Sequence, residues 1–103
     1  MSLDIWLTKE EKSITEKNIT NNLVPMWGVA GVYEALYHSQ GKKAEEILPL
    51  LENGLNKMVS EPDKFKKLNS LNSWGTYKQA VPWLEELILE FKRHPDAIIG
   101  ISY

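Results

Sequence analysis

The stretch that decides the fold is Leu3-Asp4-Ile5-Trp6-Leu7-Thr8, near the start of the chain. Apolar residues alternate with other residues at period two, which is typical of a strand with Leu3, Ile5 and Leu7 facing a core. A second short run, Ala97-Ile98-Ile99-Gly100-Ile101-Ser102-Tyr103, closes the chain and predicts another strand. Two such strands most simply pair with each other and pack against helices, and the direction of pairing stays open.

The chain between these strands is expected to be helical. The capping box Ser13-Ile14-Thr15-Glu16 predicts a helix from about Ile14 to His38, kinked or divided at Pro25. An apolar stripe over residues 44–59 predicts the clearest helix of the chain.

Two further helices are expected in the second half. Ser60 begins a short helix that ends near Leu68, and a second capping box, Thr76-Tyr77-Lys78-Gln79, begins a long one. The Asn-, Ser- and Gly-rich residues 69–75 between them predict a loop. We therefore expect a single α+β domain over residues 1–103, mostly helical, with four to five helices packed on a small sheet formed by the N- and C-terminal strands.

Composition narrows the class of protein. The 103 residues carry a formal net charge of −2 and no cysteine, which excludes disulfides, Cys-ligated zinc and thiol nucleophiles. The charge predicts no general nucleic-acid binding. No signal peptide and no apolar run of membrane-spanning length is visible, so we expect a soluble cytoplasmic protein without a membrane partner.

Catalytic motifs are weak. No G-x-S-x-G turn and no phosphate-binding glycine loop occurs, and the adjacent glutamate pairs diverge on a helix. Glu34 and His38 stand four residues apart, which lets their side chains meet as a base or as half of a metal site. We expect no enzyme, no cofactor and no metal, with a small hydrolase using this pair as one alternative.

Polar and aromatic residues in the expected first helix suggest a binding surface. At helical spacing one face would carry amides and phenols where a plain amphipathic helix carries Leu and Ile. The stripe consists of Asn18, Asn22, Met26, Val29, Tyr33 and Tyr37.

A second candidate lies before the last helix. Trp74, Gly75, Thr76 and Tyr77 stand at its expected N-terminus, where free N–H groups bind anions and an aromatic ring can stack on a base. The structural alternative is that Trp74 covers the core and Thr76 only caps the helix.

Four motifs in fixed order carry a family resemblance. They are Asn18-Ile19-Thr20-Asn21-Asn22-Leu23, Ala30-Gly31-Val32-Tyr33-Glu34-Ala35-Leu36-Tyr37, Asn72-Ser73-Trp74-Gly75-Thr76-Tyr77 and Pro95-Asp96-Ala97. Over nearly its whole length the chain resembles a family of small, largely uncharacterised proteins of phages and prophages. The resemblance implies a phage-type accessory protein in the cytoplasm of a bacterial host cell and supplies no established activity.

These observations give one expected function and two alternatives. The first is a non-catalytic protein that counters host defence by sequestering a nucleotide-like signalling molecule. The alternatives are a structural or assembly protein, acting through protein contacts or inhibition of a host protein and forming a homo-oligomer through sheet edges, and the hydrolase. The expected ligand-binding residues are Asn18, Asn22, Tyr33, Glu34, Tyr37, Trp74, Gly75, Thr76 and Tyr77.

Overall fold

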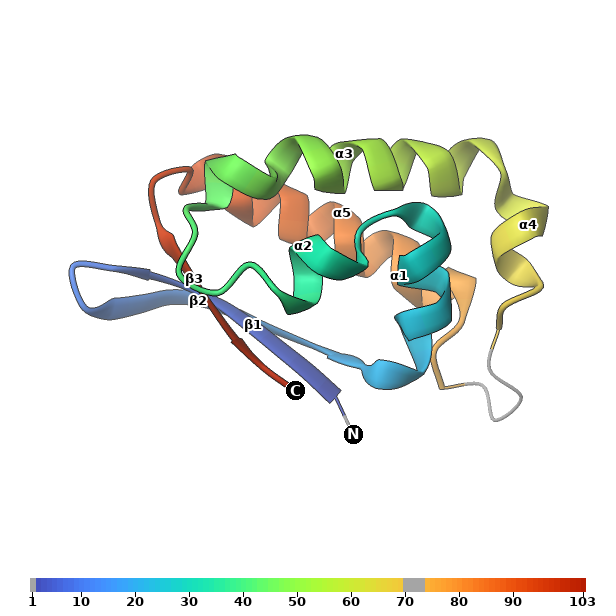
Figure 1. Cartoon of the computed structure of the whole chain (residues 1–103), viewed down its shortest axis with the longest axis horizontal. Helices are drawn as coiled ribbons and strands as arrows, with labels where there is room; N and C mark the ends of the chain where they lie inside the picture. Colours follow the sequence, from blue (N-terminus) through green and yellow to red (C-terminus); the bar gives the residue numbers. More distant parts are fainter. Residues whose placement is uncertain (1, 70–73) are drawn as a thin grey trace.

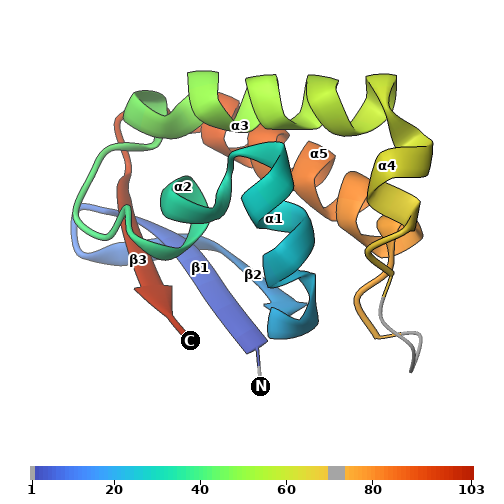
Figure 2. The same ribbon diagram turned by 45° about the vertical axis from the view of Figure 1, so that its right-hand side comes forward.

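The chain folds as one layer of helices on a three-stranded antiparallel sheet, which confirms the expected α+β class. The computed structural model describes residues 2–69 and 74–103, so residues 70–73 of the expected loop lie outside the described residues. The helices lie on one face of the sheet (Figure 1, Figure 2). The elements are β1 (Ser2–Lys9), β2 (Lys12–Thr20), the 3-10 turn η1 (Asn21–Leu23), α1 (Val24–Ala30), α2 (Tyr33–Tyr37), α3 (Ala44–Ser60), α4 (Pro62–Lys66), α5 (Tyr77–Arg93) and β3 (Ile98–Ser102).

Strand β1 is the centre of the sheet. The strand order is β2-β1-β3, and β1 pairs antiparallel with both neighbours, so the expected pairing of the two terminal strands is confirmed. Leu3, Ile5 and Leu7 of β1 are at most 1% exposed and belong to the hydrophobic core. The period-two pattern therefore identified the buried face of this strand correctly.

The prediction of a helix from Ile14 to His38 is wrong. Residues 12–20 form β2, joined to β1 by a two-residue turn at Glu10 and Glu11, whose φ values are 54° and 66°. Four of these residues are Ile or Thr, whose β-branched side chains favour extended backbone, and β1 offers an adjacent partner strand. Pro25 stands in the first turn of α1, where a missing N–H costs nothing, and does not kink a helix.

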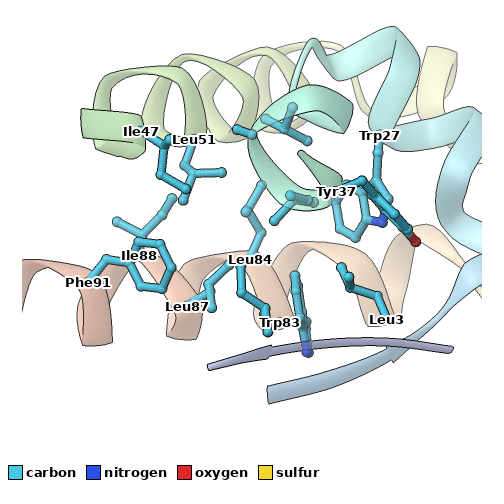
Figure 3. Close-up of a cluster of buried hydrophobic side chains, with 14 of the residues drawn as sticks. Leu3, Trp27, Tyr37, Ile47, Leu51, Trp83, Leu84, Leu87, Ile88 and Phe91 are labelled. Carbon is cyan, nitrogen blue, oxygen red and sulfur yellow. The ribbon is translucent and has the colours of Figure 1, made fainter. Parts of the chain in front are cut away.

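The core lies between the sheet and the two long helices, α3 and α5. Figure 3 shows Ile47 and Leu51 of α3 on the opposite side of this layer from Leu84 and Ile88 of α5. All four are at most 4% exposed. A fully buried side chain of this kind stabilises the fold by about 1.5–3 kcal/mol. None of the described helices combines the length and the apolar composition that a membrane span requires.

Both outer edges of the sheet have partners in part. On β3, the Ile99 carbonyl accepts a hydrogen bond from Gly41 N (2.8 Å), and Ile99 N donates to the Lys42 carbonyl (2.9 Å). On β2, the Asn18 carbonyl accepts from Trp83 Nε1 of α5 (3.0 Å). Pairing of two copies through these edges would have to replace these bonds.

Candidate functional site

Two hollows meet at Trp74, between the end of β2 and the start of α5. The larger, which we call the Trp74 groove, has a volume of about 470 Å³. The second, of about 300 Å³, shares Asn18, Thr20 and Trp74 with it and adds Ser2 and Asn22. The Trp74 groove is lined by Asn18, Ile19, Thr20, Trp74, Gly75, Gln79 and Trp83. Four of the expected site residues, Asn18, Asn22, Trp74 and Gly75, thus come together from distant parts of the sequence.

Gly75 holds the segment before α5 against the end of β2. Its φ is +95°, and a Cβ at this position would lie 2.8 Å from Asn22 Cβ and 3.3 Å from Thr20 Cγ2. Asn22 Nδ2 also donates a hydrogen bond to the Trp74 carbonyl (3.1 Å). The tight approach and this bond together fix Trp74 beside the strand.

Trp83 forms the wall of the groove that continues into the core. The residue is 9% exposed, and its ring centroid lies 5.8 Å from that of Trp27, at an interplanar angle of 41°. Its indole nitrogen is directed toward the strands (Figure 3), where it donates to the Asn18 carbonyl. Trp74, by contrast, is 69% exposed. The groove therefore combines one fixed indole with one that is open to solvent.

The polar groups of the groove retain both donor and acceptor capacity. Asn18 Nδ2 donates to Ser2 Oγ (3.0 Å) and to Asp4 Oδ1 (2.7 Å), which leaves its Oδ1 as an acceptor. Gln79 Oε1 accepts from the backbone before α5, which leaves its Nε2 as a donor. Thr20 Oγ1 accepts from Asn22 N (3.2 Å), and its hydroxyl proton can still be donated.

The N-terminus of α5 offers fewer free N–H groups than the sequence suggests. Gly75 N and Thr76 N donate to Gln79 Oε1 at 2.8 and 3.0 Å, and Tyr77 N donates to Asn69 Oδ1 at 2.7 Å. The capping box at Thr76 is present, and its glutamine occupies donors that an anion would need. A phosphate would have to displace these side chains to bind here.

Tyr33 and Tyr37 lie in a separate aromatic cluster. Their rings stack at a centroid distance of 4.9 Å, and Tyr103 meets Tyr37 edge-on at 5.1 Å. Tyr37 is 4% exposed, and its hydroxyl donates to Asn21 Oδ1 (2.7 Å). Burial, followed by the charges of Tyr33 and Tyr103, raises the pKa of Tyr37 to about 12. Tyr37 thereby ties α2 to η1, and neither Tyr33 nor Tyr37 lines the Trp74 groove.

The remaining expected residues also lie outside the groove. Glu34 is exposed on α2, with His38 at the end of the same helix, and neither lines the two hollows at Trp74. The Tyr77 hydroxyl donates to the Met58 carbonyl (2.8 Å), which ties α5 to α3. Within residues 2–69 and 74–103, no three His, Asp or Glu side chains gather closely enough to hold a metal ion.

Sequence reasoning missed several groove residues. Ser2, Ile19, Thr20, Gln79 and Trp83 were not expected in a site. Gln79 and Trp83 stand four residues apart on one helix face, so a search of the last helix for a polar residue beside an aromatic one would have found them. Thr20 could not be found, because residues 14–20 were expected to be helical.

Comparison with known proteins supplies no relative for this site. No family model matches the chain, and neither a curated protein nor a solved structure matches it. The function must therefore be inferred from the chemistry of the groove itself.

Proposed function

We propose that this chain is a non-catalytic binding protein that holds a nucleotide-like molecule in the Trp74 groove. The observation that carries the proposal is the 69% exposed indole of Trp74 at a hollow whose other groups are uncharged and hydrogen-bonding. Stacking of a base on an aromatic side chain contributes about 1–3 kcal/mol. The acceptor of Asn18 and the donors of Gln79 suit the edge of a base or the hydroxyls of a ribose.

The ligand is held by its base and sugar in this proposal, and its phosphate stays at the rim. The seven lining residues carry no charged side chain. The backbone N–H groups of Gly75, Thr76 and Tyr77 already have partners. Neither a charge nor a free helix end is thus available inside the groove to select for phosphate.

Sequestration requires binding alone, which agrees with the chemistry of this site. A groove that offers stacking and neutral hydrogen bonds retains a ligand and provides no general acid or base beside it. The resemblance to phage and prophage proteins then favours a role against host defence, in which the bound molecule is a nucleotide-like signal in the bacterial host cell.

The alternative of an assembly protein receives less support from the position of Trp74. A surface that acts through protein contacts alone would present its aromatic residues on a flat patch, whereas Trp74 borders two hollows. Sedimentation or mass measurement distinguishes the two functions, because the assembly role requires an oligomer or a partner protein and the ligand role does not.

Titration with cyclic nucleotides and ADP-ribose derivatives, followed by calorimetry, tests the proposal. We expect at least one compound to bind, and Trp74→Ala to weaken its affinity by about 5- to 150-fold, the equivalent of one lost stacking contact. Tyr103→Ala, which removes another exposed aromatic residue (59% exposed), is the matched control and should bind normally.

A second variant separates ligand contact from stability. Gln79→Glu retains the side-chain oxygen that caps α5 and removes the Nε2 donors, so it should fold normally and bind more weakly. Failure of every compound in the panel to bind, or equal affinity of the Trp74→Ala variant and the wild type, would overturn the proposal.

A further inference from the structure

The face of the sheet that points away from the helices has a composition of its own. The register places Asp4, Trp6 and Thr8 on this side, opposite to the buried Leu3, Ile5 and Leu7. We call it the outer face. Across the strands, Trp6 is flanked by Glu16 of β2 and by Gly100 of β3. None of the described helices covers this face (Figure 1, Figure 2).

An indole lies across the centre of the outer face. A Cβ placed on Gly100 would lie 2.2 Å from both Cε2 and Nε1 of Trp6, so the ring occupies the space above the glycine backbone. Trp6 is only partly buried there. Its ring is thus held in position by the sheet while part of it remains available to solvent.

Beside this indole the face is hollowed. A depression of about 480 Å³ extends from Trp6 to the tip of the β1–β2 hairpin. Glu10 and Glu11 of the hairpin form part of its wall, and they are its only charged lining residues. The rest of the lining is Thr8, Gln40, Gly41, Ile98, Ile99 and Gly100.

Charge is divided between the two sides of the hairpin. Lys9 and Lys17 pair with carboxylates outside the sheet: Lys9 Nζ lies 3.0 Å from Asp96 Oδ2, and Lys17 Nζ lies 2.8 Å from Glu86 Oε2. In the part of the chain that the structure describes, Glu10, Glu11 and Glu16 belong to none of the ion pairs. The outer face and its hollow therefore carry carboxylates that no lysine of the chain neutralises.

We propose that the outer face binds a basic segment of a partner protein through an arginine side chain. The guanidinium stacks on Trp6, where a planar cation gains from the indole face, and pairs with Glu16 and with the hairpin carboxylates. Arginine fits better than lysine, because its flat group can stack on a ring and donate in its own plane to a carboxylate.

Two other occupants fit the charge less well. A nucleic acid would bring phosphates to unpaired carboxylates. A second copy of this chain, joined through the same face about a twofold axis, would bring Glu16 and the hairpin carboxylates toward their own counterparts. The basic segment is also independent of the Trp74 groove, so either proposal can fail alone.

Fluorescence anisotropy with three labelled peptides of one length tests the proposal: alternating Arg-Gly, Lys-Gly and citrulline-Gly. Citrulline keeps the shape of arginine and removes its charge. We expect the Arg-Gly peptide to bind most tightly, the Lys-Gly peptide several-fold more weakly, and the citrulline peptide not at all. Added salt should weaken binding.

Variants locate the binding face. The triple change Glu10→Gln, Glu11→Gln and Glu16→Gln should weaken Arg-Gly binding at least tenfold. The pair Glu45→Gln and Glu85→Gln, exposed residues of α3 and α5, is the matched charge control and should bind as the wild type does. Trp6→Phe keeps a smaller ring and should reduce the preference for arginine over lysine.

Four outcomes would overturn the proposal: equal binding of the arginine and citrulline peptides, equal loss in the control pair, an unchanged arginine preference in Trp6→Phe, or sedimentation of the free protein as a dimer that the triple change dissociates.

Discussion

The turn between β1 and β2 should be a source of stored instability. Glu10 and Glu11 occupy the two central positions of the hairpin with φ values of 54° and 66°. Two-residue hairpin turns with positive φ at both positions favour Asn-Gly, because glycine has no Cβ and asparagine tolerates this region. For other L residues the left-handed conformation costs about 1–2 kcal/mol each.

The double change Glu10→Asn and Glu11→Gly should therefore raise the free energy of unfolding. Relief at the two positions is offset in part by the greater freedom of glycine in the unfolded chain, which costs about 0.5–1 kcal/mol. We expect a net gain of about 1–2 kcal/mol. In a domain of this size each kcal/mol corresponds to a rise in Tm of about 4–8 °C. Thermal and urea unfolding, followed by circular dichroism, measures the change.

A charge-matched variant separates backbone strain from repulsion between the two carboxylates. Glu10→Gln with Glu11→Gln removes the same two charges and keeps L residues with a Cβ at both positions. Its stability should stay within about 0.5 kcal/mol of the wild type, as is usual for exposed substitutions. If the glutamine pair stabilises as much as Asn-Gly, or if Asn-Gly gives no gain, the explanation from strain is refuted.

Three further predictions concern the residues around the core and the groove. Because the pKa of Tyr37 is raised from 10.0 to about 12, the neutral phenol stabilises the fold fully below pH 10. Up to about 2–3 kcal/mol should be lost as the pH rises toward 12, measured by urea unfolding, and Tyr37→Phe should lack this step. Gly75→Ala, which places a Cβ 2.8 Å from Asn22 Cβ at a positive φ, should cost about 1–3 kcal/mol and weaken ligand binding; unchanged melting would contradict the packing described. Trp83→Phe removes the donor to the Asn18 carbonyl and should cost about 1–3 kcal/mol; hydrogen exchange should then show faster opening of the end of β2, and unaltered exchange would count against this bond as an anchor.

The sequence predicted elements whose periodicity one buried face determines. Strand β1 alternates along its whole length, and α3 and α5 bury apolar residues at helical spacing, so these elements were identified correctly. Strand β2 was not, because its burial is uneven and its Ser13 and Glu16 imitate a helix cap. What decides β2 is its neighbour β1, and such a long-range pairing is not encoded locally.

The candidate site was predicted only in part, for the same reason. Asn18, Asn22 and Trp74 were selected for their chemistry, and they come together although the helix expected to align them is absent. Tyr33 and Tyr37 were grouped with them by a helical spacing that the chain does not adopt. Glu34 and Tyr77 likewise lie elsewhere, since the direction of a side chain depends on packing that the sequence does not reveal.

The two walls of the Trp74 groove are supplied by residues 18–20 and 74–83, segments that only the native chain brings into contact. An unfolded molecule offers no such receptor, so any compound that occupies the groove must shift the unfolding equilibrium toward the native state. At a concentration one hundred times its Kd, such a compound adds about 2.7 kcal/mol of stability. Melting curves recorded in fractionated extracts of bacterial metabolites can therefore reveal an occupant whose identity nobody has guessed beforehand.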